Sequence, residues 1–126
     1  MSTLLATGKE HDHHRACDSV VIVCKEACLW VIYIDLKSAN PHGYAGQFKS
    51  TRQFVRYTLG LLEEFHSQKF TEIKEHYVIL YGGNPPLLNK KTSVQKANNT
   101  GKSRPDAAFK REVPDGVRLR LKELLE

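Results

Sequence analysis

Two short apolar runs restrict the possible folds of this chain more than any other feature of its sequence. The first run covers residues 19–24 and the second covers residues 29–36. Both runs are rich in β-branched side chains and are apolar at odd and even positions alike, which is typical of strands buried on both faces. Residues 25–28 between them fit a hairpin turn, so the sequence predicts an antiparallel β-hairpin inside a sheet.

A hairpin of this length determines which residues face each other. With residues 25–28 as the turn, counting outwards along both strands places Asp18 opposite Asp35. Strand side chains alternate between faces, so Lys37 projects from the same face as Asp35, and Leu36 points into the opposite layer. Two facing carboxylates repel each other, which favours a compensating cation: Lys37 in part, and a hard divalent metal ion for the rest.

The rest of the chain predicts one long helix and further strands. The helix is expected from Tyr44 or Ala45 to about His66, with an apolar face on the sheet and a polar face in solvent. The residues expected on the apolar face are Phe48, Phe54, Val55, Leu59, Leu61, Leu62 and Phe65. The residues expected on the polar face are Lys49, Arg52, Gln53, Arg56, Glu63, Glu64 and Ser67. A third buried strand is expected at 76–81, followed after residue 116 by a half-exposed strand or, alternatively, a short helix through Leu124.

Length and composition fit one hydrophobic core. The chain has 126 residues, of which 40% are hydrophobic and 26% are charged, as in ordinary soluble globular proteins. We expect a single domain over residues 1–126, with a polar N-terminal segment at 1–16 and a flexible basic loop at 89–106. The order of elements predicts an α/β fold with a mixed central β-sheet flanked by helices.

Charge and cysteine content narrow the expected partners and compartment. The net charge of +5 is modest evidence for an anionic partner such as nucleic acid. No apolar run reaches the ~18–20 residues that a membrane span needs, so no membrane association is expected. Cys17, Cys24 and Cys28 are an odd and sparse set, which favours reduced thiols in a cytoplasmic protein. The segment EHDHH at 10–14 lacks a second ligand pair at structural zinc spacing, so we expect a solvated polar terminus there.

The hairpin and the start of the helix resemble a known nuclease superfamily. The stretches CDSVVIV at 17–23 and VIYIDLKS at 31–38 resemble the PD-(D/E)XK nucleases. In that superfamily an Asp beginning one strand and an (Asp/Glu)-x-Lys ending the next build a metal site. The stretch GQFKSTRQFVRY at 46–57 is similar to the glutamine-bearing helix of many members. The resemblance covers roughly residues 17–82 and implies a restriction-endonuclease-like fold that hydrolyses phosphodiester bonds with Mg²⁺ or Mn²⁺.

The resemblance and the hairpin register suggest roles for the residues of this motif. Asp18 and Asp35 would bind the metal ion, and the backbone carbonyl of Leu36 would complete its shell. Lys37 would act as general base or would stabilise charge on the scissile phosphate. Many relatives carry a further acid on an N-terminal helix, for which Glu10 is the candidate in this chain, with Asp12 as the alternative.

The helix offers two glutamines and a row of basic side chains. Gln47 projects towards the sheet, whereas Gln53 points to solvent, so we favour Gln47 as the residue that orients water or the catalytic lysine. Lys49, Arg52 and Arg56 are then free to contact DNA phosphates, or else form only the solvated face of the helix.

Two classes of function follow from these features. The first is a metal-dependent endonuclease or exonuclease acting on DNA, with RNA left open as a substrate and with pairing of subunits into a homodimer as one arrangement for cutting both strands. The second is a non-catalytic member of the same fold, acting as a DNA-binding or protein-interaction module. This alternative is motivated by the little room before Asp18 for the N-terminal acidic helix. A small binding protein of unrelated fold is a weaker third option.

Overall fold

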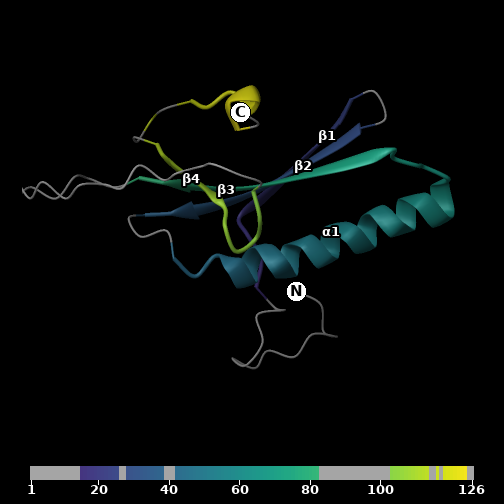
Figure 1. The fold of residues 1–126 in the computed structure, drawn as a ribbon, viewed down its shortest axis with the longest axis horizontal. Coiled ribbons are helices and arrows are strands. Elements are labelled where there is room, and N and C mark those ends of the chain that lie inside the picture. The colour runs from purple at the N-terminus through teal and green to yellow at the C-terminus, as the bar shows by residue number, and fades with distance from the viewer. Residues whose placement is uncertain are drawn as a thin grey trace, which may run out of the picture.

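The chain folds into a mixed four-stranded sheet with α1 on one face (Figure 1). The computed structural model describes residues 15–25, 28–38, 42–82, 103–113, 116 and 118–124. The elements in this part of the chain are β1 (Ser19–Lys25), β2 (Cys28–Lys37), α1 (Ala45–His66), β3 (Glu72–Tyr81), β4 (Phe109–Glu112) and the short 3-10 helix η2 (Leu121–Leu124). The strand order is β1-β2-β3-β4, with β1 antiparallel to β2 and the other neighbours parallel. The predicted α/β class and mixed sheet are confirmed, whereas only one α-helix flanks the sheet in the described part.

The β1–β2 hairpin has the register that its turn length predicts. The strand pairs run without interruption from Lys25 and Cys28 to Ser19 and Ile34. Asp18 directly precedes β1 and is therefore in phase with Asp35 on the neighbouring strand. A slip of one residue would have moved these two carboxylates to opposite faces of the sheet.

β1 lies at the edge of the sheet that the described residues form, and the prediction that it is buried on both faces is wrong. All its residues are exposed or half-buried, and Ile22 is 50% exposed. β2 lies between β1 and β3, and its residues 31–35 are all buried. The two apolar runs look alike in sequence, but α1 connects β2 to the parallel strand β3 and therefore covers these two strands more than β1.

The later strands differ from their predicted positions. β3 begins at Glu72, four residues before the predicted start at His76. The first half of β3 contains the charged residues Glu72 and Lys74, which pair at 3.3 Å. The search for apolar runs therefore did not detect it. β4 was not predicted, because its sequence FKRE has little apolar character, and it ends at Glu112 although the last strand was expected after residue 116. The predicted strand after residue 116 is wrong, and η2 is the short helix that the sequence left as the alternative.

The C-terminal end of the predicted loop at 89–106, residues 103–106, lies in the described part of the chain. Pro105 is buried. The Ser103 hydroxyl accepts the N–H of Tyr77 at 2.7 Å and donates to the carbonyl of the same residue at 2.9 Å. These residues therefore pack against β3, and the rest of the predicted loop lies outside the described residues, as do residues 1–14 with Glu10.

The core lies between α1 and the sheet, with a smaller cluster on the opposite face. Phe48 is 0% exposed and packs edge-on against Tyr77, with ring centroids 5.5 Å apart. On the other face, Ile32 and Val78 are buried and Leu124 of η2 packs against them. In the described part of the chain, no helix has the length and apolar character to cross a membrane.

The helix contacts the sheet along a narrower stripe than predicted. Phe48 and Leu59 are buried as expected, and Val55 and Leu62 pack against them. Phe54, Leu61 and Phe65 were expected in the core but are 46%, 37% and 73% exposed. A single sheet covers one side of a helix only, so a broad apolar arc leaves its flank in solvent.

Phe48 and Phe65 provide a test of this packing. Replacement Phe48→Ala removes a fully buried ring and should lower the free energy of unfolding by about 3–5 kcal/mol. Phe65→Ala removes an exposed ring of the same type and should change it by less than about 0.5 kcal/mol. Urea denaturation followed by circular dichroism measures both values, and equal losses would contradict the packing described for α1.

Candidate metal and catalytic site

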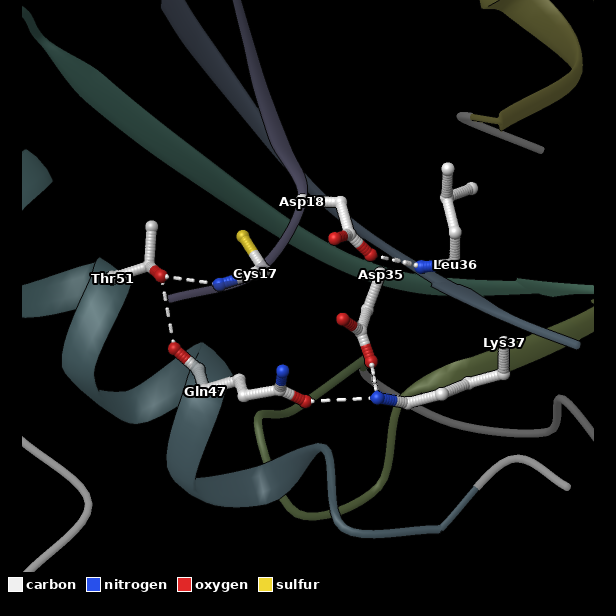
Figure 2. Close-up of polar contacts among 7 residues, drawn as sticks. All are labelled: Cys17, Asp18, Asp35, Leu36, Lys37, Gln47 and Thr51. Atoms are coloured by element: carbon white, nitrogen blue, oxygen red, sulfur yellow. Dashed lines mark hydrogen bonds and ion pairs between the residues drawn. The ribbon is translucent and has the colours of Figure 1, made fainter. Parts of the chain in front are cut away.

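The predicted site residues converge where the β1–β2 hairpin meets the first turn of α1. Asp18 directly precedes β1, Asp35 and Lys37 lie at the end of β2, and Gln47 lies in the first turn of α1. Figure 2 shows the two carboxylates side by side, with the lysine and the glutamine meeting below Asp35. The hairpin register brings the two acids together, and the crossover from β2 into α1 brings the glutamine onto the same face of the sheet.

Asp35 is a carboxylate buried at the centre of this site. It is 0% exposed, and its Oδ2 lies 2.8 Å from Nζ of Lys37. Neither carboxylate oxygen accepts a well-aligned hydrogen bond within the part of the chain that the structure describes. Burial raises the pKa of Asp35, the ammonium of Lys37 lowers it, and the negative charge of Asp18 raises it again. The carboxylate therefore has lone pairs left over for a further cation or donor.

The ammonium of Lys37 lies between the carboxylate of Asp35 and the side-chain amide oxygen of Gln47. Its Nζ contacts Oδ2 of Asp35 at 2.8 Å and donates a hydrogen bond to Oε1 of Gln47 at 3.0 Å. The lysine side chain is 21% exposed, so solvent or a ligand can reach it. The predicted orientations of the two glutamines are confirmed, since Gln47 faces the site and Gln53 is exposed.

A buried threonine ties the helix to the start of the hairpin. The Thr51 hydroxyl donates to the backbone carbonyl of Gln47 at 2.9 Å and accepts the N–H of Cys17 at 2.9 Å. The contact anchors the residue before Asp18 to the helix turn that carries Gln47 (Figure 2). Sequence reasoning missed this positioning role, for which the only signal was the spacing of four between Gln47 and Thr51 on one helix face.

Asp18 already has a structural contact. Its Oδ2 accepts the backbone N–H of Leu36 at 2.6 Å, which leaves the other oxygen for a ligand. The side chain of Leu36 is 59% exposed, so it points away from α1 as predicted but is not buried in an opposite layer. The contact that Leu36 makes at this site uses its amide, and the predicted use of its carbonyl as a metal ligand stays a prediction.

The donor set limits the kind of metal that this site could hold. Among the described residues, no three His, Cys, Asp or Glu side chains come together. The protein ligands present are thus the two carboxylates of Asp18 and Asp35, with Glu10 outside the described residues. Mg²⁺ is commonly bound through one or two carboxylates with water in its other positions. The unused lone pairs of the buried Asp35 fit such an ion.

The three predicted phosphate-contact residues have different surroundings. Lys49 is exposed. Arg52 is half-buried and faces β3, so its predicted place on the solvated face of the helix is wrong. Arg56 is mostly exposed, and its guanidinium pairs with Glu75 at 3.5 Å. The three side chains therefore do not form one basic surface.

Comparison of the chain with protein-family models, curated proteins and solved structures gives no match in any of the three. The resemblance of residues 17–82 to PD-(D/E)XK nucleases therefore stays a prediction from the sequence.

The burial of Asp35 predicts a dependence of stability on pH. Because its pKa is raised in the folded state, the folded protein binds more protons than the unfolded chain just above the ordinary Asp value. Stability is therefore lost as the pH rises through this window. Asp35→Asn removes the titration, so in metal-free buffer its melting temperature relative to that of the wild type should rise as the pH increases above the ordinary Asp pKa of about 4.

The exposed acid Asp106 provides the control for this pH series. Its side chain is 57% exposed, so Asp106→Asn makes the same chemical change at a solvated carboxylate and is measured in the same pH series. A difference between Asp35→Asn and the wild type that is the same at every pH would show that the buried carboxylate does not influence stability in this way.

Proposed function

We propose that this chain is a metal-dependent nuclease domain of the PD-(D/E)XK type that hydrolyses phosphodiester bonds of DNA. The observation that carries the proposal is the buried carboxylate of Asp35, in contact with Lys37 and in phase with Asp18. Burying a charged group without hydrogen bonds destabilises a fold. Such groups with perturbed pKa values are concentrated at functional sites.

The chain's own residues suggest a division of roles. Asp18 and Asp35 would hold Mg²⁺ or Mn²⁺ through their unused carboxylate oxygens. When bound, the ion would offset charge on the scissile phosphate and make water more acidic. Lys37 contacts its neighbours through the N–H donors of an ammonium, which supports charge stabilisation over general base catalysis. Gln47 would hold this ammonium at the site.

The charge of the chain supports an anionic polymer as the substrate. The net charge of the chain is +5. Basic side chains near a cleavage site bind phosphates without reading the sequence of bases. The choice of DNA over RNA, the pairing of subunits into a homodimer and the cytoplasmic location stay predictions from the sequence.

Removal of either central side chain should abolish cleavage. Asp35→Ala eliminates a metal ligand, and Lys37→Ala eliminates the charge beside the scissile phosphate. Each should reduce Mg²⁺-dependent cleavage at least about 10²-fold, the typical loss for a group that stabilises transition-state charge. Gel assays with plasmid, linear and branched DNA measure the rates, and circular dichroism verifies that each variant is folded.

The two glutamines of α1 give a matched control. Gln47→Ala should lower the cleavage rate about tenfold or more, because the lysine ammonium loses its hydrogen bond at 3.0 Å. Gln53→Ala makes the same chemical change at an exposed position of the same helix and should leave the rate unchanged. Wild-type rates in folded Lys37→Ala and Gln47→Ala proteins would refute the proposed mechanism.

A second candidate function is a DNA-binding or protein-interaction module without catalysis. Two observations favour it: one oxygen of Asp18 is used by the backbone N–H of Leu36, and no third acid joins the site within the described residues. In this case the carboxylate of Asp18 would serve only to accept the backbone N–H of Leu36 at the end of β2.

Calorimetric titration with Mg²⁺ and Mn²⁺ distinguishes the two functions. The nuclease should bind the ion, and Asp18→Asn should abolish binding while its amide oxygen still accepts the Leu36 N–H. At an ion concentration of about 100 Kd, binding should stabilise the wild type by about 2.7 kcal/mol. Absence of binding to the wild type, or equal binding to Asp18→Asn, would favour the module.

A further inference from the structure

One side of α1 carries an apolar stripe that the sheet leaves largely uncovered. The stripe consists of Phe54, Tyr57, Leu61 and Phe65, and Tyr57 near its centre is 67% exposed. The spacings of three, four and four residues make successive members neighbours and keep all four within an arc of about 80°. This arc is centred about 120° from the side of α1 that packs on the sheet, so the four side chains are available to another molecule.

The stripe contains all the exposed aromatic rings of the chain. Every Phe, Tyr and Trp belongs to the described residues, and of these only Phe54, Tyr57 and Phe65 are exposed. Single exposed apolar side chains are ordinary on soluble proteins, but a contiguous apolar patch marks an interaction site. The residues outside the described ranges contain no further ring, whereas a second copy of the chain offers three rings in a matching row.

The area of the stripe is sufficient for a weak dimer. Its exposed fractions are equivalent to about two fully exposed large side chains, or about 400–500 Å² per copy. Two copies, with the polar residues at the rim, would bury about 1,000 Å², which is the lower limit for a specific interface. We therefore expect a dissociation constant in the micromolar range.

The order of residues along the stripe fits two antiparallel helices. When the midpoints of two antiparallel stripes coincide, Phe54 of each copy lies against Phe65 of the other. Tyr57 then lies against Leu61 of the other copy. Every member of the stripe meets another member of the same stripe, as a two-fold symmetric interface requires.

The charges of α1 favour the same direction. Lys49 and Arg56 are exposed in its first half, and Glu63 and Glu64 are exposed near its end. Antiparallel packing brings the basic half of each helix beside the acidic end of the other, whereas parallel packing brings like charges together.

We propose that two copies of this chain form a dimer through the stripe, with their α1 helices antiparallel. This inference goes beyond the proposed nuclease and does not rest on it, because none of the four residues belongs to the metal site. The edge of β1, where Ile22 is 50% exposed, is the other apolar surface at which two copies could pair.

Sedimentation equilibrium of the wild type, in metal-free buffer without DNA, tests the dimer. Between about 1 and 500 μM, the average mass should rise reversibly from 14.3 kDa towards twice that value. Tyr57→Lys inserts a charge near the centre of the contact and should weaken association at least about tenfold. A wild type that stays monomeric at every concentration would overturn the proposal.

Ile22→Lys is the matched control for Tyr57→Lys. It also replaces an exposed apolar side chain by lysine, but on β1, and should leave the dissociation constant unchanged. Circular dichroism verifies that both variants are folded. Loss of the dimer in Ile22→Lys and its retention in Tyr57→Lys would assign the contact to β1 and overturn the role of α1. Equal losses in both variants would also contradict it.

Disulfide cross-linking tests the direction of the helices. In a Cys24→Ser/Cys28→Ser background, the double variant Phe54→Cys/Phe65→Cys should form a covalent dimer under mild oxidation. Positions 54 and 65 lie about 16–17 Å apart along one helix, which is too far for a disulfide within one copy. Neither single variant should cross-link efficiently. Efficient cross-linking of the single variants would indicate parallel helices and overturn the antiparallel arrangement.

Sedimentation and cleavage assays separate this inference from the proposed nuclease. A wild-type protein that dimerises but cleaves no DNA would refute the nuclease and leave the dimer. A wild-type protein that cleaves DNA and stays monomeric would refute the dimer and leave the nuclease.

Discussion

The burial of the Asp35 carboxylate is the constraint on which the site depends. β2 runs between β1 and β3 and beneath α1, so its residues 31–35 are withdrawn from water on every side. A charge in that position requires a neighbour of opposite sign, and Lys37, two residues further on the same face, supplies it at 2.8 Å. The strand leaves the covered region just there, so the ammonium reaches the surface while the carboxylate does not.

The residues around this ion pair are held in place by hydrogen bonds that involve the backbone. The amide of Leu36 fixes Asp18, and the hydroxyl of Thr51 links the amide of Cys17 to the helix turn that carries Gln47. These bonds bring two strand ends and a helix turn to one place with few polar side chains. The arrangement resembles sites in which a small number of groups are held rigidly for a charged ligand.

The helix α1 separates two polar regions of different character. One side of its first turns faces the acids and lysine at the end of β2, and the other side carries Arg52 towards residues 72–77 of β3. In the part of the chain described, the buried side-chain atoms without a hydrogen bond are the two oxygens of Asp35, of which Oδ2 pairs with Lys37, together with Nε of Arg52, Nδ1 of His76 and the hydroxyl of Tyr77. The remainder of the interior is apolar or paired, so the unpaired atoms are local features and not a sign of loose packing.

The sequence alone determined the hairpin, its register, the bounds of α1 and the orientation of Gln47. These features depend on neighbours in the chain, through alternation in strands and the 3.6-residue period of the helix. Tertiary structure decided the rest. Ile22 is exposed because β1 is at an edge, Arg52 is half-buried because α1 crosses beside β3, and β4 is a strand because β3 offers it an edge. Since none of these partners is close in the sequence, no local pattern could predict them.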